Sequence, residues 1–143
     1  MTVEEFEIWL RRAESNLRIA RVGREEGVFL EDLCFEAQQA AEKALKALLI
    51  YMGGEYPRVH TFTVLLARLG QYVTVPESIQ DAVELSDYAV QMRYPGDYYP
   101  VSEEEYERAL ELAERVLRWV RLQVEHSEGQ GEPCAGPFPP RDL

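Results

Sequence analysis

Apolar residues recur at intervals of three or four along most of this 143-residue chain, which is the spacing of amphipathic α-helices. No segment shows the strict alternation that predicts a strand. The periodic segments predict helices over about residues 2–23, 30–52, 61–72, 76–92 and 102–126. The expected fold is therefore all-α, an antiparallel bundle of four long helices plus one short helix.

Local signals mark several helix ends. Ser102 with Glu105, like Thr2 with Glu5, fits a capping box, in which each residue satisfies a free backbone N–H of the other. The pair of glycines at 53–54 ends the second predicted helix, and Pro95 ends the fourth. The second helix is alanine-rich and apolar over a wide arc, which predicts a central position among several neighbours.

The domain organisation follows from where the periodicity stops. Residues 1–126 are expected to form one helical bundle. Residues 127–143 are rich in glycine and proline, and we expect them to form a C-terminal tail.

Composition narrows the function classes. The formal net charge is −11, so binding of nucleic acid by charge alone is not expected, and a nucleic-acid role would need a local basic site. No apolar run approaches the length of a membrane span, and the acidic start "MTVEEFEIWL" does not resemble a signal peptide. Two cysteines, Cys34 and Cys134, suggest neither a disulfide framework nor a metal site. The expected location is the cytoplasm.

Candidate chemistry is sparse. Two histidines, His60 and His126, rule out a His-rich metal centre, and we expect no metal and no cofactor. His60 opens the short helix, where it either bonds a free backbone group or acts on a ligand as a proton donor or phosphate contact. Lys43 and Lys46 are the only two lysines. Their ordinary interpretation is a set of solvated charges at helical spacing with Glu42, and their functional interpretation is a ligand contact.

The stretch "QMRYPGDYYP", residues 91–100, stands out between two helical segments. Arg93 suits the negative end of the preceding helix and also suits a phosphate. The tyrosines, among them Tyr94 and Tyr98, either pack on the prolines to close a corner or stack on a ligand. Composition alone leaves both interpretations open.

Three segments in order resemble the HEPN domain family (higher eukaryote and prokaryote nucleotide-binding domain). They are "FEAQQAAEKALKALLIYMG", like the family's central helix, "HTFTVLLARL", like its short helix, and "YAVQMRYPGDY", like its R-Y-P corner. The resemblance extends from about residue 5 to residue 125. It implies a helical bundle that dimerises and that often acts beside a minimal nucleotidyltransferase in a toxin–antitoxin-like pair.

Some members of the family are metal-independent ribonucleases whose motif is an arginine followed four to six residues later by a histidine. Here the corresponding positions after Arg93 hold Asp97, Tyr98 and Tyr99, so the motif is missing and catalysis is not expected. The resemblance favours ligand binding by Arg93, Tyr94, Asp97 and Tyr98, with Lys43 and His60 as further contacts.

Three hypotheses result. The first is a non-catalytic homodimer that binds a nucleotide, RNA or a minimal nucleotidyltransferase partner. The second is a ribonuclease with a non-standard site, in which Tyr98 or His60 replaces the missing base. The third is a purely structural dimerisation module.

Overall fold

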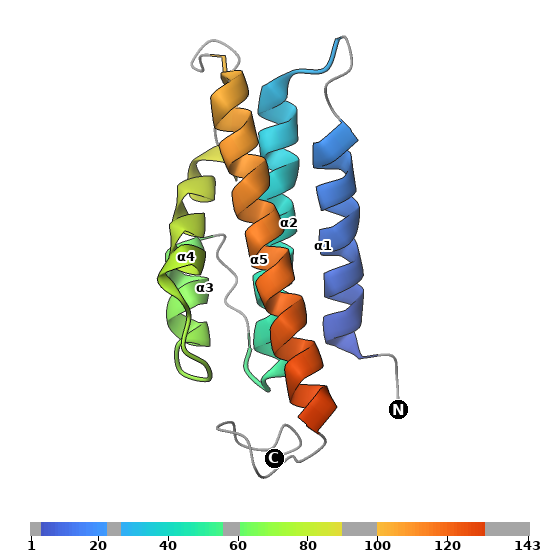
Figure 1. Cartoon of the computed structure of the whole chain (residues 1–143), viewed down its shortest axis with the longest axis vertical. Helices are drawn as coiled ribbons and strands as arrows, with labels where there is room; N and C mark the ends of the chain where they lie inside the picture. Colours follow the sequence, from blue (N-terminus) through green and yellow to red (C-terminus); the bar gives the residue numbers. More distant parts are fainter. Residues whose placement is uncertain (1–3, 23–26, 56–60, 90–99, 131–143) are drawn as a thin grey trace.

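Helices account for most of the described chain, which comprises residues 4–22, 27–55, 61–89 and 100–130 of a computed structural model (Figure 1). In chain order the elements are α1 (Glu5–Val22), α2 (Leu30–Tyr51), α3 (Phe62–Leu69), α4 (Glu77–Gln80), the 3-10 helix η1 (Asp81–Ala89) and α5 (Glu103–Gln130). The three long helices α1, α2 and α5 lie side by side along the long axis, and α3, α4 and η1 lie across from α1 (Figure 1). The expected all-α bundle is confirmed.

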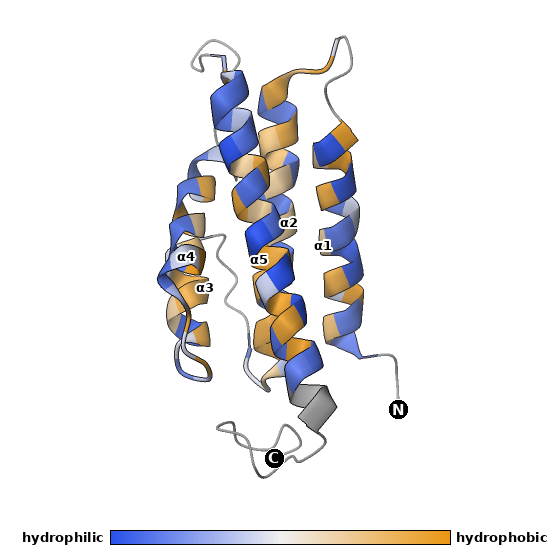
Figure 2. Ribbon diagram, in the orientation of Figure 1, coloured by the Kyte–Doolittle hydropathy of each residue, from blue (hydrophilic) through white to orange (hydrophobic). Residues whose placement is uncertain are grey.

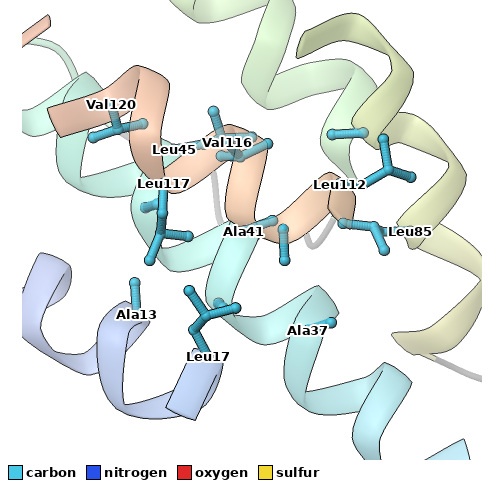
Figure 3. Close-up of a cluster of buried hydrophobic side chains, with 14 of the residues drawn as sticks. Ala13, Leu17, Ala37, Ala41, Leu45, Leu85, Leu112, Val116, Leu117 and Val120 are labelled. Atoms are coloured by element: carbon cyan, nitrogen blue, oxygen red, sulfur yellow. The ribbon is translucent and has the colours of Figure 1, made fainter. Parts of the chain in front are cut away.

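Helix α2 is the centre of this bundle, as its wide apolar arc predicts. It packs against α1, α3, η1 and α5. Its many alanines let neighbouring backbones approach closely, since a methyl group fills little space between two helices. Figure 3 shows part of the resulting core, to which three helices contribute Ala13 and Leu17 (α1), Ala37, Ala41 and Leu45 (α2) and Leu112, Val116 and Leu117 (α5).

Two predicted helix ends are present. The Ser102 side chain accepts a hydrogen bond from the backbone N–H of Glu105, and the Glu105 carboxylate accepts one from the N–H of Ser102, each at 3.0 Å. This is the reciprocal capping box expected at the start of α5. Gly53 follows the end of α2 with φ = 93°, a backbone conformation that favours glycine.

Two buried tyrosines also join helices that are distant in sequence. The Tyr106 hydroxyl donates to the carbonyl of Ala20 at 2.6 Å, and so satisfies one of the last carbonyls of α1. The Tyr51 hydroxyl donates to the carbonyl of Val124 at 3.4 Å. Each bond links an end of one long helix to another long helix.

The fourth predicted helix differs in type from the expectation. It is one α-helical turn, α4, continued by the nine-residue 3-10 helix η1. Ile79, Ala82 and Leu85 are buried and Tyr88 is half-buried, so the inward positions recur every three residues. A 3-10 helix places residues i and i+3 on one side, and this period matches it better than the 3.6 of an α-helix.

The last helix is longer than expected. Helix α5 continues to Gln130, four residues beyond the boundary placed at residue 126. Residues 131–143 of the expected tail lie outside the described part of the chain. None of the helices in the described ranges is both long enough and apolar enough to cross a membrane.

Candidate functional site

Most of the predicted site lies outside the described residues. Arg93, Tyr94, Asp97 and Tyr98 fall within residues 90–99, and His60 falls within residues 56–60. Whether these side chains come together therefore stays a prediction. Lys43 is described, and so are the elements that precede and follow residues 90–99.

Those two elements meet the start of α2 at one end of the bundle (Figure 1). Helix η1 ends at Ala89, and the chain resumes at Pro100 and the buried Val101 before α5 begins. The backbone N–H of Val101 donates to the carboxylate of Glu31 at 3.2 Å. Glu31 lies in the first turn of α2 and is 6% exposed. A buried carboxylate thus holds Val101, two residues before α5 begins, against the first turn of α2.

Cys34 lies one turn after Glu31 and is fully buried. Burial, with smaller contributions from the charges of Glu105 and Glu31, raises the pKa of the Cys34 thiol to about 12. Burial also raises the pKa of Tyr88 to about 12, with Cys34 and Glu105 among the further causes. Both groups therefore keep their protons at neutral pH, and neither serves as a base or a nucleophile there.

Stability should consequently fall at alkaline pH. Below about pH 9, the ordinary pKa of the thiol, Cys34 is protonated in both states and contributes no pH dependence. Above it the unfolded thiol ionises while the folded one does not until about pH 12, so the free energy of unfolding decreases. The slope is at most about 1.4 kcal/mol per pH unit for one group. Urea unfolding between pH 8 and 10.5 measures it.

The control for this prediction is Cys34→Ala, which should give a shallower decrease over the same pH range. An equal slope in both proteins would show that the thiol ionises alike in the folded and unfolded states. The folded protein should also resist alkylation at Cys34 near neutral pH, because the reactive species is the thiolate.

A second polar group lies between α1 and α2. The Lys43 ammonium donates to the side chain of Asn16 at 2.9 Å, and the Asn16 amide donates to Glu36 at 2.7 Å. Lys43 is only half-buried, and α1 supplies its partner. These bonds account for Lys43 as a helix–helix contact, and nothing in the geometry directs it toward the end of the bundle where residues 90–99 begin and end.

Next to it, three polar residues run along α2 at four-residue intervals and are buried. Gln38 donates to Glu42 at 2.7 Å, and Glu42 forms an ion pair with Lys46 at 2.9 Å. The Lys46 ammonium also lies 5.5 Å from the centre of the Trp9 ring of α1. The interpretation of Lys46 and Glu42 as solvated charges was wrong: their side chains are 7% and 4% exposed. The covering helix α1, which the spacing within α2 does not reveal, is the reason.

The outer surface carries exposed or half-buried ion pairs. Arg108 pairs with Glu84, and its hydrogen bond lowers the pKa of that carboxyl. Arg21 of α1 pairs with Glu114 of α5 at 2.8 Å, and a pair between Glu14 and Arg121 joins the same two helices. In the part of the chain that the structure covers, no group of three or more His, Cys, Asp and Glu side chains is arranged to hold a metal ion.

Comparison with known proteins identifies the family. The sequence model of the HEPN domain matches residues 6–123. The fold resembles the crystal structure of TT1696 from Thermus thermophilus, with 35% identity, a TM-score of 0.72, and coverage of 83% of this chain and 98% of that one. It also resembles ST0689, an archaeal HEPN homologue, with 32% identity, a TM-score of 0.69, and coverage of 85% and 99%. No curated protein matches the sequence. The chain belongs to the HEPN domain family.

Proposed function

We propose that this protein is a non-catalytic HEPN homodimer that binds a nucleotide, RNA or a minimal nucleotidyltransferase partner through the corner at residues 91–100. Family membership supports the general role. Arg93 supplies a permanent positive charge whose geometry matches phosphate oxygens. Tyr94 and Tyr98 supply aromatic faces on which a base can stack.

The proposal that the protein does not cleave RNA is supported by the protonation of two groups near this end of the bundle and by the positions of the histidines. Metal-independent cleavage of RNA needs a base that takes the proton of a 2′-hydroxyl near neutral pH. Tyr88 lies on η1, which precedes residues 90–99, and Cys34 lies near the start of α2; both have pKa values raised to about 12. His126, the one histidine within the described ranges, is exposed near the far end of α5. No histidine follows Arg93 at the family's catalytic spacing.

Charge at this end of the bundle bears on affinity. Glu31 is buried beside Val101, and Glu105 is exposed in the first turn of α5. These carboxylates oppose the approach of a phosphate, so binding depends on the arginine of the corner. We therefore expect weak binding that decreases as salt concentration rises.

The test is binding of a fluorescently labelled single-stranded RNA, and separately of ATP, to the purified protein in the presence of chelator. We expect weak, salt-dependent binding with the RNA left intact, and a loss of at least about tenfold in affinity for Arg93→Ala, as for removal of one charge-assisted contact. Arg118→Ala is the matched control, because Arg118 is an exposed arginine of α5 without an ion pair in the described structure. RNA cleavage that Arg93→Ala abolishes would contradict the proposal.

Copurification from native cells separates the two kinds of ligand. A nucleotidyltransferase that is recovered with the wild-type protein but not with Arg93→Ala assigns the corner to a protein partner. A bound nucleotide without such a protein assigns it to the small ligand. Recovery of neither ligand, together with no binding in solution, would favour the purely structural module.

A further inference from the structure

Helix η1 keeps its 3-10 geometry over nine residues, directly after the single α-helical turn α4. Its inward row consists of Ala82 and Leu85, which are fully buried, and Tyr88, which is partly buried and packs against the core. Figure 2 shows that apolar and polar residues alternate closely along this part of the chain. The packing of these three side chains therefore favours the 3-10 form.

Two features of this form are unfavourable. The hydroxyl oxygen of Ser86 is buried and has no hydrogen-bond partner in the described structure, so it has lost its contact with water without replacement. Val83, an apolar residue, is 39% exposed. In a helix with three residues per turn, positions 83 and 86 lie on the same flank, beside the inward row rather than in it.

The same residues also fit an α-helix that continues α4. With 3.6 residues per turn, positions 82, 83 and 86 all come within about 60° of the buried Ile79. Val83 then joins the inward face, and Val90 follows at the same spacing in the sequence. The Ser86 hydroxyl can donate to the carbonyl of Ala82, four residues earlier, as serine does within α-helices. An α-helical form thus removes both unfavourable features.

The α-helical form has its own cost, which falls on the other two inward residues. In α geometry Leu85 and Tyr88 turn about 120° and 180° away from Ile79, and so lose their contacts with the core. This loss explains why the 3-10 form is the one described. Turning Tyr88 outward also exposes an aromatic ring only five residues before Arg93 in the sequence.

We infer that η1 converts between this 3-10 form and a minor α-helical form, and that the α-helical form presents the Tyr88 ring to a base of the ligand bound at residues 91–100. The second part rests on the proposed function, whereas the conversion itself does not. An aromatic ring stacks on a base of any sequence, and only the α-helical form offers this contact, so the ligand shifts the population toward that form. Tyr88 is then a further ligand contact beside Tyr94 and Tyr98.

Two substitutions at Ser86 test the conversion. Ser86→Leu adds an apolar side chain to the inward face of the α-helical form, whereas the matched control Ser86→Ala only removes the unpaired hydroxyl of the 3-10 form. In NMR spectra, cross-peaks from an α proton to the amide four residues later mark an α-helix, and those to the amide two residues later mark a 3-10 helix. We expect the first kind over residues 82–89 in Ser86→Leu. We expect the second kind in Ser86→Ala, together with a higher urea midpoint. The 3-10 pattern in both variants overturns the conversion.

The wild-type protein provides a test that does not depend on how Ser86→Leu folds. Saturation-transfer NMR should detect, over residues 82–89, a minor state that has helical chemical shifts and exchanges within milliseconds. A minor state with the shifts of an unfolded segment, or no minor state, overturns the conversion. In Ser86→Leu the pKa of the Tyr88 phenol, which burial raises to about 12 in the 3-10 form, should return toward its ordinary value of 10.0.

Binding of ATP and of the labelled RNA tests the role of Tyr88. Ser86→Leu should bind at least about fivefold more tightly than Ser86→Ala, because a larger fraction of the protein is in the binding form. Tyr88→Ala in the Ser86→Leu background should remove this gain. Equal affinities of the two Ser86 variants overturn the role of Tyr88 and leave the conversion standing. If neither the variants nor the wild type bind either probe, the proposed function is wrong, and with it the role of Tyr88.

Discussion

Replacing Lys46 by methionine should lower the free energy of unfolding by about 3–5 kcal/mol, the usual cost of removing one member of a buried ion pair. The Lys46 ammonium lies 2.9 Å from the Glu42 carboxylate, and both side chains are almost fully buried. Methionine fills a similar volume but removes the ammonium that forms the ion pair with the Glu42 carboxylate. The hydrogen bond from the neutral Gln38 amide, at 2.7 Å, does not replace that cation. Equilibrium urea unfolding at neutral pH measures the difference.

Two further variants test whether the loss of stability comes from the buried Glu42–Lys46 ion pair. Lys43→Met is the matched control on the same helix, and it should cost about 0.5–1.5 kcal/mol, since the half-buried Lys43 loses only its bond to Asn16. The double variant Glu42→Leu/Lys46→Met should recover most of the lost stability, because both charges of the buried pair are removed together. A loss below about 1 kcal/mol for Lys46→Met would mean that water reaches the pair, as it reaches surface ion pairs.

Leu45→Ala should cost about 2–5 kcal/mol of unfolding free energy, the range for creating a cavity in a core. Leu45 is fully buried on α2, and Figure 3 shows it close to Val116 and Leu117 of α5. Because α2 touches four other elements, the surrounding helices cannot all move inward to fill the space. Thermal and urea unfolding followed by circular dichroism would record the change.

Leu122→Ala removes the same atoms from a leucine that is 60% exposed on α5, and it should change stability by no more than about 0.5 kcal/mol. The ratio of the two effects therefore reports burial rather than residue type. Similar losses for Leu45→Ala and Leu122→Ala would contradict the assigned core.

The bundle could be predicted from the sequence because each long helix has its own apolar stripe. In α5, Tyr106, Ala109, Ala113, Val116 and Val120 are all buried, as their spacing indicates. The type of the fourth helix could not be predicted so simply, because residues 79–88 combine positions that fit both helical periods. Its inward residues are selected by α2 and α5, which are distant in sequence.

In the candidate site, too, local features could be predicted from the sequence and contacts between distant segments could not. Local composition singles out residues 91–100, and all but the last of these lie outside the described ranges. Sequence analysis missed the residues that surround Val101. Glu31 and Cys34 come from the start of α2, far from Val101 in the chain. A carboxylate and a thiol in an otherwise ordinary helical pattern gave no local sign of that contact. Burial of Glu42 and Lys46 was missed for a similar reason, because α1 covers them.

The 3-10 geometry of η1 also affects which part of the protein unfolds locally. Runs of 3-10 helix longer than three or four residues are uncommon because their hydrogen bonds are poorly aligned, and η1 extends over nine residues. Its amide protons should therefore exchange with solvent through small local openings, whereas those of α2 exchange only when the bundle unfolds globally. We therefore expect η1, which leads into residues 90–99, to open at a lower free-energy cost than α1, α2 and α5.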